Sequence, residues 1–228
     1  MGARSELAVQ FFHDVLCAWC YALSPRLERL KGDLAKEGVM VRIEHHAFAL
    51  APEAVDLERM FGSPDAAKRE ILRHWRAANA NDDAHRIRAD VMEQRPFPYP
   101  FSTPALLACQ AAHILEGNEG HGRYFGRVQR AHLTECLDIN DRTVLLNCAQ
   151  ELGFDRAAFD RAMHSEEARR RLEADLALAR ALGITGVPTL VLDRRWVVVG
   201  AQPYDRLWAA FEQVLQARDG EEPLNPDR

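Results

Sequence analysis

The sequence predicts an α/β protein in which a small core, built from both ends of the chain, is interrupted by a large all-helical insertion. Strand-like runs lie near the start and near the end of the 228 residues, and the segment between them has helical periodicity almost throughout. A hydrophobic content of 47% is enough for a well-buried core. We expect a core formed by residues 1–55 and 183–218, an insertion of residues 56–182, and a loose tail over 219–228.

The N-terminal part of the chain has the pattern of a β-α-β unit. Residues 7–15 are mostly apolar and favour a strand, and leucines at helical spacing then run from Cys17 to about Lys36, before Gly38. Residues 39–48 alternate apolar and polar side chains. They predict a second strand, parallel to the first because a helix connects the two.

The middle of the chain predicts helices with charged outer faces. Breaks fall at Gly62-Ser63-Pro64, at a proline cluster over 95–100 and at Gly117, and Asp155 and Ser165 are suited to cap helices. The expected helices cover residues 57–78, 103–116, 120–136, 141–152, 155–163 and 165–182.

The C-terminal part returns to the core. Residues 186–192 are β-branched and apolar, Asp193-Arg194-Arg195 favours a turn, and residues 196–199 run back as a hairpin partner. Pro203 suits the first position of a last helix that ends at about Ala217.

Composition argues against several classes of protein. The net charge of −5 is mild and the basic residues are dispersed, so we expect no nucleic-acid partner. No run is long enough to cross a bilayer and the N-terminus has no apolar signal segment, so we expect no membrane partner. Cys109, Cys136 and Cys148 stand alone in helical patterns, as small buried hydrophobes do in a reducing cytoplasm. Both a monomer and a homodimer fit the sequence.

A pair of cysteines, Cys17-Ala18-Trp19-Cys20, stands where the first strand gives way to the first helix. With Cys17 at the helix N-terminus and Cys20 one turn later, both thiols lie on one face of that helix. The positive end of the helix dipole and the unpaired backbone N–H groups favour a thiolate there. The pattern therefore indicates a reversible dithiol/disulfide pair.

Three other interpretations of the pair are open. A structural zinc site needs four ligands, but the chain has no second Cys-x-x-Cys, and the spacing to His45-His46 matches no usual zinc module. A permanent disulfide between residues so close in sequence adds little stability. Coincidence is the third interpretation. The strand-to-helix context favours the redox pair over all of them.

A second candidate element is Val187-Pro188, at the head of the predicted third strand. Proline cannot donate to a sheet, so we expect it at the start of the strand, after a tight turn at Gly186. This position suits a cis peptide bond, and a trans proline that merely begins the strand is the alternative.

Taken together, these features resemble the DsbA branch of the thioredoxin superfamily and are most similar to its FrnE-like, cytoplasmic members. The likeness extends from about Leu7 to Ala217 and includes Asp14, Cys17-Ala18-Trp19-Cys20-Tyr21, Gly186-Val187-Pro188 and Gly200-Ala201-Gln202-Pro203. Ala18 stands where the family commonly has proline, and Phe101-Ser102-Thr103-Pro104 replaces an Asn-Thr…His-Arg pattern of FrnE-like proteins.

The resemblance implies a thioredoxin-like fold in which cis-Pro188 faces the cysteine pair. Cys17 would be the exposed attacking thiol and Cys20 the buried thiol that resolves the mixed disulfide, while Val187 would offer backbone hydrogen bonds to an extended substrate. Trp19 would supply an apolar contact to that substrate. The implied partners are disulfide- or thiol-containing proteins or glutathione, with no cofactor beyond the Cys17–Cys20 disulfide and no metal.

Two polar residues before the pair are candidate modulators of the thiols. Asp14 either assists proton transfer to or from Cys20 or hydrogen-bonds backbone at the strand end. His13, like His45 and His46, would favour a thiolate if it carried charge near the sulfur, whereas a satisfied or solvent-facing histidine is the ordinary alternative.

Two other functions share features with this sequence. Glutathione-dependent isomerases and kappa-like glutathione transferases of the same fold activate a small thiol instead of exchanging disulfides. Those relatives usually have serine where this chain has Cys17 and do not need Cys20, so the two cysteines together favour the oxidoreductase. A binding or chaperone module with incidental cysteines is the third hypothesis.

Overall fold

The computed structural model describes residues 5–220, and within them the strands form one mixed sheet. Its order is β2-β1-β3-β4, with β1 parallel to β2 and β3 antiparallel to both of its neighbours. The strands are β1 (Ser5–His13), β2 (Val39–Ala47), β3 (Thr189–Leu192) and β4 (Trp196–Val199). The predicted parallel β-α-β unit and the C-terminal hairpin are both confirmed.

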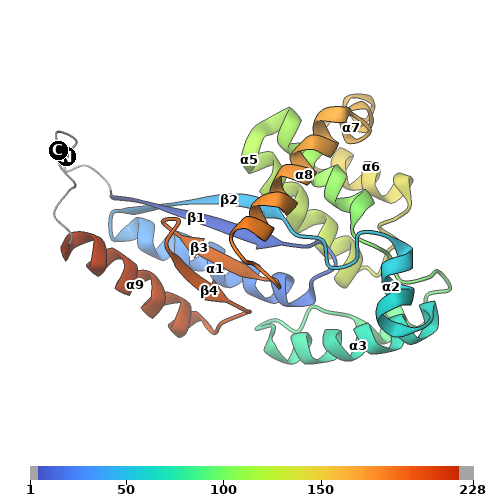
Figure 1. Cartoon of the computed structure of the whole chain (residues 1–228), viewed down its shortest axis with the longest axis horizontal. Helices are drawn as coiled ribbons and strands as arrows, with labels where there is room; N and C mark the ends of the chain where they lie inside the picture. Colours follow the sequence, from blue (N-terminus) through green and yellow to red (C-terminus); the bar gives the residue numbers. More distant parts are fainter. Residues whose placement is uncertain (1–4, 221–228) are drawn as a thin grey trace.

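Helices connect and cover these strands. α1 (Ala18–Lys36) joins β1 to β2, and α9 (Tyr204–Gly220) follows β4. The insertion between β2 and β3 contains α2 (Ala54–Phe61), α3 (Pro64–Asn81), α4 (Ala89–Glu93), α5 (Thr103–Leu133), α6 (Arg142–Glu151), α7 (Arg156–Met163) and α8 (Glu166–Ala181). Figure 1 shows α1 and α9 running along the sheet, with the insertion gathered toward the end at which β1 and β2 finish.

β1 is the central strand and is buried on both faces. Leu7, Val9 and Phe11 belong to the main core, whereas Phe12 points the other way and packs with Ala179 of α8. A strand covered on both sides has a nearly continuous apolar run, which explains why β1 shows so little alternation in the sequence.

The helix boundaries follow local signals that the sequence displays. Asp155 and Ser165 accept backbone N–H groups as N-caps of α7 and α8, as predicted. At the expected break, α5 is kinked, because Glu116 and Gly117 leave the helical conformation and Gly117 adopts a φ of 69°. That left-handed backbone favours glycine.

The predicted break at Gly62-Ser63-Pro64 is confirmed, because it divides the segment over 57–78 into two helices, α2 and α3. Two other boundaries differ from the prediction. α4 was not expected, because five residues are too few to show a period. α9 continues to Gly220, past the predicted end near Ala217, and the rest of the tail predicted over 219–228 lies outside the described residues.

The second half of α5 packs closely on β2, and a glycine permits this approach. A Cβ atom on Gly122 would lie 2.6 Å from Nε2 of His45, whereas one on Gly126, a turn further along, would meet nothing within 4 Å. Across residues 5–220, no helix combines the length and the apolar composition needed to cross a membrane.

Candidate functional site

The cysteine pair follows a tight turn at the end of β1. The backbone N–H of Cys17 donates to the carbonyl of Asp14 at 3.1 Å, which closes the turn and delivers Cys17 as the N-cap of α1. The Sγ atom of Cys17 accepts the N–H of Cys20 at 3.1 Å. A sulfur thus takes the position that a serine or aspartate oxygen usually occupies at a helix start. The predicted placement at the helix N-terminus is confirmed.

The two thiols are free and differ in burial. Cys20 is fully buried, and that burial, followed by the neighbouring Cys17, raises its pKa well above the usual value. The expectation of an exposed Cys17 is wrong, because only 4% of this residue is accessible. Its sulfur turns inward to cap α1 and to contact the loop before β3. Trp19, between the two cysteines, is partly buried.

The loop before β3 brings the second predicted element to the pair. The Val187–Pro188 peptide bond is cis, and Pro188 is buried directly before the first residue of β3. The Sγ atom of Cys17 lies 3.5 Å from the carbonyl oxygen of Val187, to which the thiol donates. Antiparallel pairing of Phe12 with Thr189 accounts for the approach, because it places the start of β3 beside the end of β1.

Asp14 is a fully buried carboxyl with three hydrogen-bond donors. It accepts the N–H groups of Leu16 at 3.0 Å and Leu50 at 2.6 Å and the hydroxyl of Ser102 at 2.7 Å. Burial raises its pKa to about 6, against the opposing effect of these donors. Its negative charge in turn contributes to the raised pKa of Cys20. Backbone binding, one of the two interpretations of Asp14, is therefore observed, and a role in proton transfer stays a proposal.

His13 lies in a buried cluster of rings. Its Nε2 atom is 3.1 Å from Nδ1 of His45, its ring stacks on Phe125 at 3.7 Å, and the ring of His121 meets it edge-on at 5.3 Å. Burial, and then the neighbouring His45, lowers the pKa of His13 well below the usual value. At neutral pH the ring is uncharged, so it offers no positive charge to a thiolate.

His46, on the other face of the sheet, belongs to a separate network. Its Nδ1 atom lies 2.8 Å from Asp175 of α8, whose carboxylate also accepts the N–H of Ala47 at 3.0 Å and the side-chain amide of Gln110 at 2.7 Å. These contacts fasten α8 and the first half of α5 to β2.

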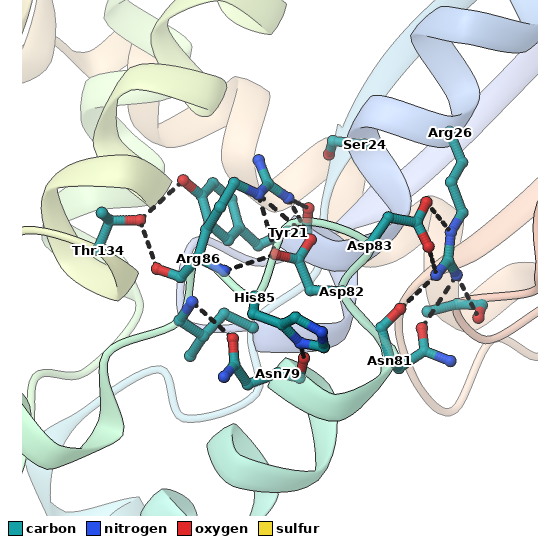
Figure 2. Close-up of polar contacts among 12 residues, drawn as sticks. Tyr21, Ser24, Arg26, Asn79, Asn81, Asp82, Asp83, His85, Arg86 and Thr134 are labelled. Carbon is teal, nitrogen blue, oxygen red and sulfur yellow. Dashed lines mark hydrogen bonds and ion pairs between the residues drawn. The ribbon is translucent and has the colours of Figure 1, made fainter.

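A polar network around Tyr21, the residue after Cys20, fixes the direction of α1 (Figure 2). The guanidinium of Arg86 donates to the carbonyl of Tyr21 at 2.8 Å and lies 4.0 Å above its ring, while Asp82 holds the guanidinium from the other side at 2.6 Å. The Tyr21 hydroxyl meets the hydroxyl of Thr134 at 2.9 Å. Tyr21 directly follows Cys20, so this network anchors the first turn of the helix.

Arg26 holds the next turn of α1. Its side chain is only 6% exposed and pairs with Asp83 at 2.6 Å. The same guanidinium donates to the carbonyl of Asn81 (Figure 2). It also donates to the carbonyls of Ala201 and Gln202. The end of α3 and the loop before α9 are thereby joined to the helix that carries the thiols.

The structure thus brings Cys17, Cys20, Val187 and Asp14 together and leaves Trp19 partly accessible nearby. Two contributors were missed from the sequence: Ser102, which binds Asp14, and Gln129, which binds the backbone of the turn. Neither has a motif, because each is recruited by packing of α5. Among residues 5–220, no cluster of histidine, cysteine, aspartate and glutamate side chains is arranged to hold a metal ion.

A sheet of this order, with a Cys-x-x-Cys pair at the start of the helix that follows its first strand, is the arrangement of a thioredoxin-like domain. The chain belongs to the DSBA-like thioredoxin domain family, whose profile matches residues 8–212. The thioredoxin-like fold with a long helical insertion between β2 and β3 is therefore confirmed.

Individual relatives have different functions. The ClpXP adapter protein SpxH of Bacillus subtilis (strain 168) is 24% identical over 226 residues, which cover 96% of this chain and 70% of that protein. The cytosolic disulfide reductase DsbM of Pseudomonas aeruginosa is 27% identical and superposes with a TM-score of 0.70, covering 92% of this chain and 99% of its own. A second DsbM structure contains GSH and gives 28% identity and a TM-score of 0.69.

A third relative shares the fold alone. A 2-hydroxychromene-2-carboxylate isomerase is 18% identical, with a TM-score of 0.67 over 94% of this chain and 100% of its own. The same architecture therefore occurs in proteins with different activities, and the residues at the site must decide between them.

Proposed function

We propose that the protein is a thiol-disulfide oxidoreductase that acts on protein or small-molecule disulfides through Cys17 and Cys20. One observation supports this most strongly: the Cys17 sulfur caps α1 and contacts the Val187 carbonyl beside a cis-proline, while a second thiol is buried one turn below. Neither an isomerase nor a binding module requires the second thiol.

In the reductive direction, the Cys17 thiolate attacks one sulfur of a substrate disulfide. The substrate S–S bond breaks, a mixed disulfide forms, and the first substrate sulfur leaves as a thiolate that takes up a proton. Cys20 then loses its proton and attacks the Cys17 sulfur, which releases the second substrate thiol and leaves a Cys17–Cys20 disulfide. The substrate gains two electrons, the protein loses two, and the oxidative direction is the reverse.

The helix start favours the first step. The N–H of Cys20 points at the Cys17 sulfur at 3.1 Å, and the other unpaired N–H groups of the first turn add their dipoles. These groups are already in place to stabilise the Cys17 thiolate that makes the attack.

The second step needs a base near Cys20, because burial raises the pKa of that thiol. Asp14 is the buried group suited to take the proton, since its pKa of about 6 leaves it ionised at neutral pH. Proton transfer from a thiol of raised pKa to this carboxylate is unfavourable by itself. We therefore propose that it occurs together with the attack of the Cys20 sulfur on Cys17.

Substrates would meet the partly buried Val187 and Trp19 before Pro188, which is buried behind them. An extended peptide that pairs with the backbone of Val187 would displace the Cys17 thiol from its carbonyl and expose the sulfur. Glutathione is a second proposed partner, and the GSH in a DsbM structure supports it. We also propose a cytosolic location, because DsbM is a cytosolic disulfide reductase. The FrnE-like subgroup and the choice between monomer and homodimer stay predictions.

Two alternatives make different demands on the thiols. A glutathione-dependent isomerase or a kappa-like glutathione transferase would need at most one of the two cysteines. An adapter, the function that the SpxH relatives have by name, would bind a protein partner without turnover.

The test is reduction of insulin and of glutathionylated peptide, with glutathione as the electron source. We expect turnover that Cys17→Ser abolishes, and a trapped mixed disulfide in Cys20→Ser. Cys148→Ala, which removes a buried thiol remote in sequence from the pair, should retain turnover. Glutathione-dependent activity on an aromatic substrate that survives Cys20→Ser would instead support the isomerase or transferase. Absence of turnover in the wild-type protein would refute the proposal.

A further inference from the structure

Gln129, near the end of α5, holds the backbone of the cysteine turn. Its side chain is fully buried, and its Nε2 atom donates to the carbonyl of Cys17 at 3.1 Å and to that of Asp14 at 3.3 Å. These carbonyls mark the two ends of the turn: the first also accepts the N–H of Tyr21, the opening bond of α1, and the second accepts the N–H of Cys17. One amide group therefore ties both ends of the turn together.

The insertion contacts the turn at a second point. Ser102, which precedes α5, donates to the Asp14 carboxylate, and its own N–H donates to the carbonyl of Ala51 at 2.7 Å. The turn that carries Cys17 is thus held from Ser102 and from Gln129, at opposite ends of α5. The helical insertion, as well as the sheet, fixes the position of the attacking sulfur.

The other end of the Gln129 amide is unusual. Its Oε1 atom is buried and has no hydrogen-bond partner within residues 5–220. An unpartnered buried acceptor is unfavourable, and an apolar side chain of similar size would avoid it. The donated bonds to the turn are what a glutamine supplies here that an apolar residue does not.

We propose that Gln129 is a positioning residue that stabilises the reduced form of the Cys17–Cys20 pair. It holds Cys17 at φ −77° and ψ 101°, the N-cap conformation in which the sulfur meets the N–H of Cys20. In the disulfide, that sulfur is bonded to Cys20 and has no proton left to donate to the carbonyl of Val187, so fewer contacts depend on its N-cap position. Loosening the turn therefore destabilises the reduced form more than the oxidised form, and the pair becomes easier to oxidise.

This inference rests on the proposed function only in that Cys17 and Cys20 form a redox couple. The measurable reaction is oxidation by glutathione disulfide: two protein thiols and one GSSG give the protein disulfide and two GSH. Its equilibrium constant is obtained by titrating the purified protein in glutathione buffers and counting free thiols, with no substrate or turnover involved.

The test variant is Gln129→Met, which keeps an unbranched side chain and removes the donor. We expect the equilibrium constant to rise about tenfold, equivalent to a reduction potential lower by about 30 mV for a two-electron couple. Gln129→Leu is the second variant if the first folds poorly.

Gln110→Leu is the matched control. Gln110 is also a buried glutamine of α5, but its amide donates to Asp175 of α8 instead of to the turn. Gln110→Leu should lower the melting temperature of the protein and leave the equilibrium constant for disulfide formation within twofold of the wild-type value. An unchanged constant in Gln129→Met and Gln129→Leu, or an equal shift in Gln110→Leu, would overturn the inference. Absence of turnover in a wild-type protein that still equilibrates with glutathione disulfide would count against the proposed function alone, and failure of the wild-type protein to form any disulfide would overturn both.

Discussion

Asp14→Asn is the sharpest test of how the buried carboxyl contributes to this fold. Burial raises the pKa of Asp14 from 3.8 to about 6. At about 1.4 kcal/mol for each factor of ten, this difference corresponds to about 3 kcal/mol. Because the pKa is higher in the folded protein, the protonated carboxyl stabilises the fold. That contribution is fully present below the unfolded value and is lost as pH rises through the folded value.

Asparagine has no such pH dependence, but it cannot satisfy the same donors. The carboxylate accepts Leu16 through Oδ1 and Leu50 through Oδ2, so an amide NH₂ at either position leaves one buried N–H without an acceptor. That loss is about 1–3 kcal/mol at any pH. The variant should therefore be clearly less stable than the wild type in acid, and close to it or more stable at neutral pH.

The assay is urea unfolding of both proteins at about pH 4.5 and about pH 7.5. Between these values the difference in free energy of unfolding should move by about 2 kcal/mol in favour of Asp14→Asn. Titration of buried histidines occurs in both proteins and cancels in the comparison. Asp90→Asn, at an exposed aspartate of α4, makes the same amino-acid change outside the core and serves as the comparison variant. An equal difference for Asp14→Asn at both pH values would refute this account.

Two further predictions concern the contact between α5 and β2. Gly122→Ala places a Cβ 2.6 Å from Nε2 of His45 and should lower the free energy of unfolding by about 1–3 kcal/mol. Gly126→Ala, which has open space around it, should raise the free energy of unfolding by up to about 1 kcal/mol. Similar effects of the two substitutions in urea unfolding would contradict this account of the packing. Burial, and then His45, lowers the pKa of His121 well below 6.5, so the neutral ring contributes stability that is lost as pH falls through the unfolded value. In His121→Leu, the slope of stability against pH below about 6.5 should be shallower by about 1.4 kcal/mol per pH unit. An unchanged slope in urea unfolding of His121→Leu would contradict this prediction.

The main error at the site concerns the accessibility of Cys17. The resemblance implied an exposed thiol, yet the sulfur is turned inward onto the N–H of Cys20 and the carbonyl of Val187. Exposure depends on how closely the loop before β3 approaches α1, and that distance is set by pairing between β1 and β3. No local pattern encodes it.

Local signals were sufficient for most of the secondary structure and for the cysteine pair. Periodicity marked β1, α1 and β2, helix caps at Asp155 and Ser165 had their usual residue types, and a Cys-x-x-Cys after an apolar strand placed the sulfur at a helix start. These features depend on residues within one or two turns of each other, so the chain displays them directly.

Only the tertiary structure decided what surrounds the sulfurs. Ser102 and Gln129 reach the turn because α5 packs against it, and Val187 meets Cys17 across 170 positions of sequence. A glutamine or a serine in a helical segment has no local signal for such a role, since its partner is chosen by the packing of distant elements. The sequence alone determined which two cysteines form the Cys-x-x-Cys motif and that this motif stands at the start of a helix. The assembled fold determined their burial, their hydrogen bonds and the carboxyl beside them, because each of these requires chain segments that meet only after folding.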